Sequence, residues 1–339
     1  MSFFPFKFGI RFSKIYFWLK KSQWYSEKQI QYYQRTALKD IVSHAYNNIP
    51  YYKRVFNERG LKPGDIEDKK DLAKIPFLTK ELIRKNYKDL IWDKAESKEI
   101  ISYYTSGSTS EPLEVKLDKR TVLLDRALYF RAWSLAGWKD GMRVAAFRPI
   151  VRTMNPKKNI FYYAKSNMLY LNPCVLSKGI LEEYISILEK FKPDFINSHP
   201  STLGIIVKYL KYKRINLSFS LKSILTLGTA LYPDLRKEIE DYLNCSVFDW
   251  YGMNECIISA NECSGHSGYH LNFEQGILET VKDGIFDRGP EIVGTALINK
   301  VMPFIRYKIG DEADINNNGC ICGRQGSILK SVFGRERDS

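Results

Sequence analysis

The sequence predicts an α/β protein of mainly parallel sheets flanked by helices, with a smaller β-rich part after them. Its 339 residues and 44% hydrophobic content suffice for a substantial core. From Glu99 to Gly252 short apolar runs alternate with amphipathic helical patterns, which is typical of a parallel sheet. After Cys263 the runs stay short and are separated by turn residues, which indicates a β-rich subdomain.

Residues 1–24 interleave aromatic and basic side chains, and two interpretations are open. The aromatics pack on the domain as an N-terminal helix, which we favour, or the segment makes peripheral contact with an anionic membrane. Because charges interrupt every apolar stretch, it is neither a signal peptide nor a spanning helix, and we expect a cytoplasmic protein. The residues concerned are Phe3, Phe4, Phe6, Phe8, Phe12 and Phe17, with Lys7, Arg11, Lys14, Lys20 and Lys21.

The elements that follow divide the chain into three predicted regions. Residues 1–95 form a helical N-terminal layer with breaks at Pro50, Pro63 and Pro76. Residues 96–255 form the α/β core and residues 256–333 the β-rich subdomain. Predicted strands lie at 100–105, 113–117, 143–147, 194–198, 223–228, 246–252, 276–281, 294–299 and 303–310, and predicted helices at 120–136, 178–191, 203–212 and 233–243.

The formal net charge of +14 favours anionic partners such as nucleotides or phospholipid headgroups. A nucleic-acid partner rests on charge alone, so we predict no specific one. With four histidines and no Gly-x-Ser-x-Gly motif, a hydrolase triad has little support.

The strongest local signal is a loop of five hydroxyl side chains around a glycine, directly after a predicted strand: Thr105, Ser106, Gly107, Ser108, Thr109 and Ser110. Such a loop offers backbone N–H groups and hydroxyls to phosphate oxygens. No Gly-Lys-Ser or Gly-Lys-Thr follows, so it is not a Walker loop, and an ordinary turn is the alternative.

Three further segments follow in order: Tyr-Gly-Met-Asn-Glu at 251–255, Arg-Tyr-Lys-Ile-Gly-Asp at 306–311 and Gly-Arg-Glu-Arg-Asp at 334–338. With the hydroxyl-rich loop they resemble the adenylate-forming superfamily of CoA ligases, luciferases and adenylation domains. Within it, the chain is most similar to the phenylacetate-CoA ligase and CapK branch. The segments at residues 44–66 and 72–84 also resemble this branch. The resemblance implies the large N-terminal domain of the adenylate-forming fold.

The resemblance also implies roles for single residues. The 105–110 loop, with Thr105 in a catalytic role, would hold the phosphates of ATP, and Tyr251 with Gly252 and Asn254 would lie near adenine and phosphate. Asp311 would accept hydrogen bonds from the ribose hydroxyls of ATP or AMP. Glu255 would bind magnesium, because a carboxylate suits a hard cation. Arg335 would face ribose or phosphate, and His199 would lie where the family lines its acyl pocket.

Several positions depart from the family pattern. Ser110 stands where glycine is usual, Asn254 replaces threonine, and Lys308-Ile309 replaces Arg-Thr. Residues 334–339 would be the hinge to a small domain whose catalytic lysine has no counterpart after Ser339. The resemblance therefore implies impaired activity of this chain.

The cysteines suggest a second site. Cys263 and His270 lie on one predicted loop, and Cys320 and Cys322 form a Cys-x-Cys-Gly turn. Three thiolates and one imidazole satisfy tetrahedral zinc coordination. Some members of the branch carry such a zinc, whereas plain burial of the cysteines is the alternative.

The predicted reaction is ATP-dependent activation of a small carboxylic acid to acyl-AMP, followed by transfer to CoA or an amine. Relatives of the CapK type suggest a role in cell-surface polysaccharide biosynthesis. The alternative is a degenerate nucleotide-binding module without catalysis.

Overall fold

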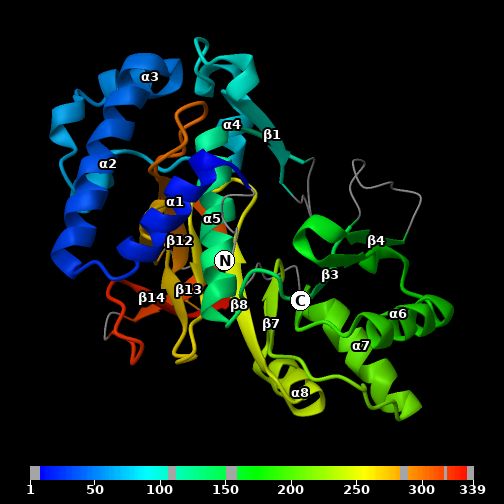
Figure 1. The fold of residues 1–339 in the computed structure, drawn as a ribbon. Coiled ribbons are helices and arrows are strands. Elements are labelled where there is room, and N and C mark those ends of the chain that lie inside the picture. Colours follow the sequence, from blue (N-terminus) through cyan, green and yellow to red (C-terminus); the bar gives the residue numbers. More distant parts are fainter. Residues whose placement is uncertain (1–7, 106–111, 150–158, 283–288, 317–318, 334–339) are drawn as a thin grey trace. The chain divides into compact units, whose positions relative to one another are not determined.

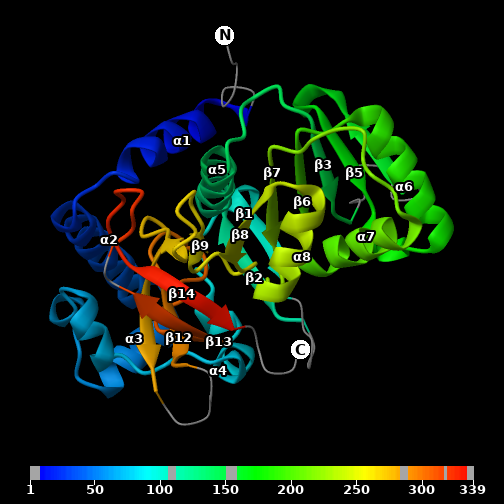
Figure 2. The same cartoon turned by 90° about the horizontal axis from the view of Figure 1, so that it is seen from below.

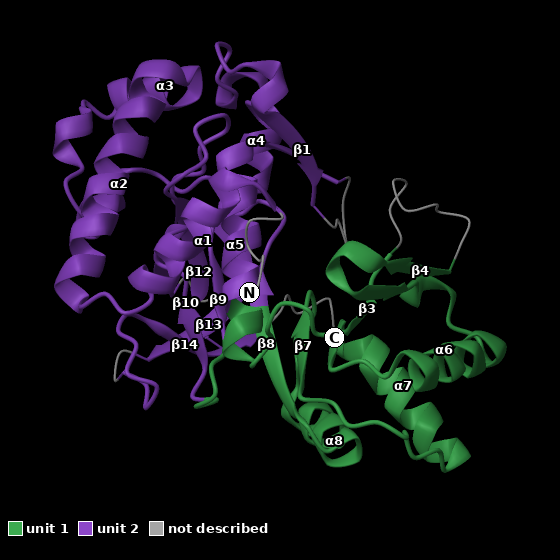
Figure 3. Ribbon diagram, viewed as in Figure 1, with its two compact units in different colours: residues 1–7, 132–250, 262–266 green, residues 8–131, 251–261, 267–339 purple. Residues whose placement is uncertain are grey.

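The structure is a computed structural model and describes residues 8–105, 112–149, 159–282, 289–316 and 319–333. The described residues form two compact units (Figure 3). Unit 1 holds residues 132–250 and 262–266, and unit 2 holds residues 8–131, 251–261 and 267–333. These units do not follow the predicted regions 1–95, 96–255 and 256–333, which stay a prediction.

Unit 1 is built on a mainly parallel sheet with the strand order β4-β5-β3-β6-β7-β8 (Figure 1). The β4–β5 pair is antiparallel and the other four pairs are parallel. This confirms the fold class that the alternating pattern predicts. The strands are β3 (Val144–Phe147), β4 (Ile160–Tyr163), β5 (Met168–Leu171), β6 (Phe195–Ser198), β7 (Ser223–Leu227) and β8 (Ser246–Gly252).

Three helices cover this sheet: α6 (Lys178–Phe191), α7 (Pro200–Lys213) and α8 (Pro233–Leu243). The Ser177 side chain caps α6, and a proline occupies the first position of α7 and of α8, where its fixed φ favours helix initiation. Their apolar faces and the sheet share one buried core, which includes Phe147, Leu203, Ile224 and Val247.

Unit 2 contains an antiparallel sheet in the order β11-β12-β13-β14-β10-β9 and a separate β1–β2 hairpin. The antiparallel sheet is the predicted β-rich part. The β1–β2 hairpin, which comes earlier in the chain, belongs to the same unit. The strands are β1 (Ile100–Tyr104), β2 (Glu114–Asp118), β9 (Ser259–Asn261), β10 (Tyr269–Leu271), β11 (Gly276–Val281), β12 (Glu291–Ala296), β13 (Tyr307–Asn316) and β14 (Ile328–Phe333).

The helical layer of unit 2 begins with α1, whose inner face is buried at Phe12, Tyr16 and Leu19. The predicted packing of an N-terminal helix is thus confirmed at Phe12, whereas Phe17 remains 47% exposed. A Ser26–Gln29 capping box starts α2. The α-helices are α1 (Ile10–Ser22), α2 (Glu27–Asn48), α3 (Pro50–Glu58), α4 (Lys80–Lys85) and α5 (Lys119–Leu135), the last belonging to unit 2 up to Arg131. None of the helices within the described ranges is both long and apolar enough to cross a membrane.

A buried polar network joins α1, α5 and the loop before β11. Arg131 Nη1 donates to Glu274 Oε1 at 2.7 Å, and Arg131 Nη2 donates to Asn272 Oδ1 at 2.7 Å. Arg131 also donates to the Leu19 carbonyl, and Ser22 donates to Glu274. The side chains of Arg131 and Glu274 are only 5% and 0% exposed, so water cannot solvate either charge. Loss of one partner would therefore leave the other charge buried and unpaired.

Candidate functional site

Thr105 lies at the end of β1, where the predicted hydroxyl-rich loop begins. Its backbone N–H donates to the Leu113 carbonyl at 3.0 Å, and its hydroxyl accepts from the Leu113 N–H at 3.1 Å. The β1–β2 hairpin therefore fixes the base of the loop. Residues 106–110, which complete the predicted phosphate-binding set, lie outside the described residues.

The Tyr-Gly-Met-Asn-Glu segment contacts this hairpin. Asn254 Nδ2 donates to the Tyr104 carbonyl at 2.9 Å, directly before Thr105. Glu255, the predicted magnesium ligand, is 6% exposed, and Gly252 ends β8. Asn254 thus links the segment to the base of the loop, whereas the family resemblance implies only a contact to phosphate.

Asp311 meets the same segment from β13. Tyr251 Oη donates to Asp311 Oδ2 at 2.8 Å, across 60 residues of sequence. Gly310 precedes Asp311 with a φ of 83°, in the left-handed region that favours glycine. The structure therefore brings together Thr105, Tyr251, Asn254 and Asp311, four of the predicted residues. Arg335 lies outside the described residues.

The predicted zinc ligands also converge. The ligand atoms of Cys263, His270, Cys320 and Cys322 all lie within 4.8 Å of one another. Cys263 lies two residues after the end of β9. His270 is in β10, the strand that pairs with β9. Cys322 Sγ lies 3.4 Å from His270 Nε2, close to the separation of about 3.5 Å between a sulfur and a nitrogen on one tetrahedral zinc.

The electrostatics of this group suit a metal. Burial and the nearby cations Arg324 and Arg131 lower the pKa of His270 to about 4, so its imidazole is neutral at pH 7 and keeps a lone pair for a ligand bond. The Gly265 N–H donates to Cys263 Sγ at 3.3 Å, which favours a thiolate. Cys256 and His266 lie outside the group: Cys256 is buried, and His266 contacts Glu262 and Phe248.

His199 directly follows β6 in unit 1 and precedes the first residue of α7. Its ring lies against Gly228, just after β7, where an added Cβ would come within 2.5 Å of His199 Cε1. Burial and the Arg148 charge lower the pKa of His199, so the ring is neutral at pH 7. The carboxyl ends of β6 and β7 are where open parallel sheets bind ligands.

Comparison with known proteins identifies the family. The profile of the family described as AMP-binding enzyme matches residues 66–331. The chain belongs to the AMP-binding enzyme family. Among curated relatives, this AMP-binding enzyme is 24% identical to phenylacetate-coenzyme A ligase of Thermus thermophilus, covering 90% of this chain and 70% of that protein. It is 25% identical to protein CapK of Staphylococcus aureus, covering 90% and 68%.

Solved structures agree on the fold. The chain superposes on 2-hydroxyisobutyryl-CoA ligase in the postadenylation state with a TM-score of 0.76 and 17% identity, covering 94% of this chain and 70% of that one. The same ligase in the thioesterification state gives a TM-score of 0.76 with 19% identity, covering 93% and 70%. The fold of an adenylate-forming ligase is therefore shown.

The strand that carries Asp311 is clamped by the N-terminal layer of this AMP-binding enzyme. The N–H of Leu78 donates to the Arg306 carbonyl at 2.9 Å, and the N–H of Lys308 donates to the Leu78 carbonyl at 2.9 Å. The Phe77 ring lies 4.3 Å from the Arg306 guanidinium and 5.2 Å from Lys308 Nζ. Lys308, which replaces the family arginine, thus serves this clamp and pairs with Glu291 at 2.9 Å.

Sequence reasoning missed the role of Arg306. Its guanidinium pairs with Glu279 at 3.1 Å and donates to the Ile75 carbonyl at 2.6 Å. The one signal in the sequence for this role is that Arg306 begins the motif at 306–311, which ends at Asp311.

We expect Arg306→Lys to lower the free energy of unfolding by about 1–2 kcal/mol, because lysine keeps the charge but cannot form the forked contact. Urea denaturation measures this. The control is Arg54→Lys, whose fork to Asn86 and Asp89 is exposed and should change stability by less than about 0.5 kcal/mol. An equal effect of both substitutions would contradict the stabilising role of the buried Arg306 contacts.

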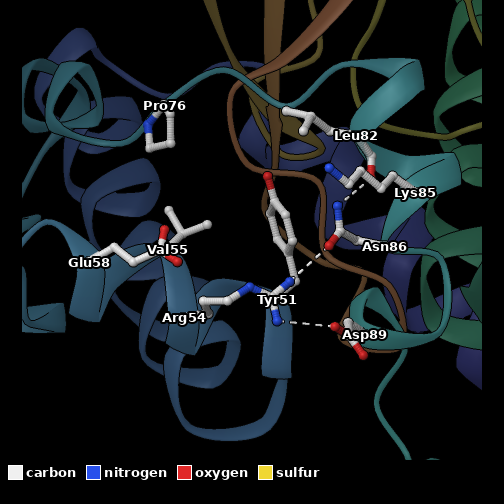
Figure 4. A pocket seen from close by; sticks show the side chains of 9 residues that line it. All are labelled: Tyr51, Arg54, Val55, Glu58, Pro76, Leu82, Lys85, Asn86 and Asp89. Carbon is white, nitrogen blue, oxygen red and sulfur yellow. Dashed lines mark hydrogen bonds and ion pairs between the residues drawn. The ribbon is translucent and has the colours of Figure 1, made fainter.

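Arg54 belongs to a pocket within the helical layer of unit 2 (Figure 4). There the guanidinium bridges α3 to Asn86 and Asp89, which follow α4. None of the predicted nucleotide or metal residues lines this pocket, whose lining residues are Tyr51, Arg54, Val55, Glu58, Pro76, Leu82, Lys85, Asn86 and Asp89.

Proposed function

We propose that this chain binds ATP and activates a small carboxylic acid as acyl-AMP, which then passes to CoA or an amine. The observation that carries the proposal is the joining of three separate motifs, through Tyr251 to Asp311 at 2.8 Å and Asn254 to Tyr104 at 2.9 Å. Two relatives agree with it: phenylacetate-coenzyme A ligase, and a CoA ligase solved with 2-HIB-AMP and CoA.

In the proposed reaction, a carboxylate oxygen of the acid attacks the α-phosphorus of ATP and pyrophosphate leaves. The acyl-AMP carbonyl is then attacked by a thiol or amine, and AMP leaves. Asp311 accepts hydrogen bonds from the ribose hydroxyls, held in place by Tyr251, which lies beside adenine. Catalysis is by positioning and charge neutralisation, so no side-chain nucleophile is needed.

The phosphates would be held by residues 105–110, with Thr105 at the base of their loop. Glu255 would bind a magnesium ion, which neutralises phosphate charge, and Arg335 would face ribose or phosphate. His199 and Gly228 would border the acyl group at the sheet edge of unit 1. We further propose a role in cell-surface polysaccharide biosynthesis, which the resemblance of the sequence to the CapK branch supports.

A zinc ion bound by Cys263, His270, Cys320 and Cys322 is the second part of the proposal. The donor set of three sulfurs and one nitrogen suits zinc and leaves no ligand position for a substrate. The ion would therefore serve structure, tying the β9–β10 hairpin to the turn before β14.

We expect Asp311→Ala to weaken AMP binding about 10- to 100-fold, because hydrogen bonds to a charged group contribute about 1.5–3 kcal/mol. Calorimetric titration with AMP measures this. Asp314→Ala, an exposed aspartate on the same strand, is the matched control and should bind as the unaltered chain does. Unchanged affinity in Asp311→Ala would refute the ribose assignment.

Pyrophosphate release across a panel of carboxylic acids tests the reaction itself. Release that depends on one class of acid supports activation. Nucleotide binding that depends on Asp311, without release for any acid, favours the alternative of a degenerate nucleotide-binding module.

A further inference from the structure

The first helix of unit 2, α1, has two faces of different character. Its inner face packs on α5, where the Phe12 and Phe130 rings lie 6.0 Å apart and Arg131 donates to the Leu19 carbonyl at 3.1 Å. Figure 2 shows α1 running beside α5 at the margin of unit 2. These buried contacts hold α1 to the unit as a fixed element and determine which side chains point outward.

The outer face carries large apolar side chains in an exposed row. Ile10 is 72% exposed, Phe17 is 47% exposed and Trp24 is 58% exposed. Ile10 and Phe17 lie seven residues apart, which is two turns of an α-helix, and Trp24 lies in the turn directly after α1. Lys14 and Lys21 are also exposed and fall between them at the same helical spacing. We call these five residues the α1 stripe.

The charged side chains of α1 itself are all basic. Arg11, which pairs with Glu99 at 3.9 Å, and Lys20 add to the two lysines of the stripe, and the first acidic residue of the whole sequence is Glu27. Alternating basic and bulky apolar side chains on one helical face match the chemistry of the membrane interface. There rings enter the boundary between headgroups and acyl chains, and cations contact anionic headgroups.

A second copy of this chain fits the same face less well. An isologous contact would oppose Lys14 and Lys21 to the same lysines of the other copy, with no acidic partner on the helix. Like charges brought together across an interface are unfavourable. A bilayer rich in anionic lipid meets both the charge and the apolar requirement.

We propose that the α1 stripe docks this protein on an anionic membrane surface, with α1 in the plane of the interface and its inner face still on α5. Binding is peripheral and reversible, because three apolar side chains enter the interface and no chain segment crosses it. The proposal concerns where the protein works and is independent of the reaction proposed above.

Sedimentation of the full chain with vesicles tests this. The protein should bind vesicles of phosphatidylcholine mixed with phosphatidylserine, and not vesicles of phosphatidylcholine alone. Binding should weaken as salt is added, because screening acts on contacts between exposed charges. The double variant Phe17→Ser/Lys21→Gln should weaken the partition coefficient by about 10-fold or more. Circular dichroism and melting confirm that the variant remains folded.

The chain offers a matched control on α7, where Tyr212 is 80% exposed beside exposed Lys213. Tyr212→Ser/Lys213→Gln removes one exposed ring and one cation, as the stripe variant does, and should leave vesicle binding unchanged. Equal loss in both variants, equal binding to uncharged vesicles, or no binding would overturn the proposal. So would self-association that the stripe variant abolishes in the absence of vesicle binding.

Trp24 gives an independent readout of depth. The emission attributable to Trp24, obtained as the difference from Trp24→Phe, should shift to shorter wavelength when anionic vesicles are added, as the indole enters a less polar layer. An unshifted Trp24 spectrum on bound protein would show that another surface makes the contact.

Discussion

Removal of zinc is expected to lower the melting temperature of this AMP-binding enzyme by about 6 °C, because 1 kcal/mol shifts the melting temperature of a 339-residue chain by about 1.4 °C. The shift corresponds to about 4 kcal/mol, the linkage energy lost when free zinc falls from about 1,000 times its dissociation constant to none. The physical reason is that Cys263 and His270 lie on one hairpin and Cys320 and Cys322 on another turn, so an ion bound by all four would close the loop between them. Melting of the full chain with and without a chelator measures the shift.

The cysteine pattern offers a control for the zinc prediction. Protein purified without chelator should contain about one zinc per chain by elemental analysis, and Cys322→Ser should lose most of it. Cys174→Ser alters an exposed cysteine outside the group and should keep both the metal and the melting temperature. Metal-free protein with unchanged melting in chelator would favour simple burial of the cysteines.

Arg131→Met should lower the free energy of unfolding by about 3–5 kcal/mol. The substitution leaves Glu274 as an uncompensated charge with a fully buried side chain, since Arg131 supplies its cationic partner at 2.7 Å. It also removes the donors to Asn272 and to the Leu19 carbonyl. Urea denaturation followed by circular dichroism gives the difference.

Two further variants separate the ion pair from other effects of the substitution. Arg131→Met/Glu274→Leu should recover part of the loss, because no buried charge then remains unpaired. Lys237→Met breaks an exposed pair with Asp241, 2.9 Å long, and should leave the free energy of unfolding nearly unchanged. A loss in Arg131→Met no larger than in Lys237→Met would contradict the structural role of the network.

The fold class was predictable because most elements carry their own local signal. The helices at 178–191 and 233–243 have bounds that match the prediction, since each begins at a capping serine or a proline and keeps helical periodicity to its end. The strands β4 and β5 were missed, because no glycine or proline separates them and the turn is made by Asn167 at a φ of 55°.

The site was predictable as a set of motifs and not as a set of contacts. Tyr251, Asn254 and Asp311 could be named from the ordered motifs, but the bonds from Tyr251 to Asp311 and from Asn254 to Tyr104 join positions 60 and 150 residues apart. Local periodicity contains no information on such pairs. The same limit applies to Glu274, which reads as part of a polar turn and is a fully buried partner of Arg131.

The pairing of Leu78 with Tyr307 has a consequence for biosynthesis. Unit 2 is assembled from the two ends of the sequence, whereas nearly all of unit 1 is continuous from residue 132 to 250. A ribosome adds about 5–20 residues per second, so residues 8–131 wait on the order of 10 s for β13 to emerge. During that interval the Tyr33 ring of α2 lacks Phe273, and the segment of Phe77 and Leu78 lacks β13. Chaperone demand should therefore fall on the nascent N-terminal segment, while unit 1 can complete its sheet during translation.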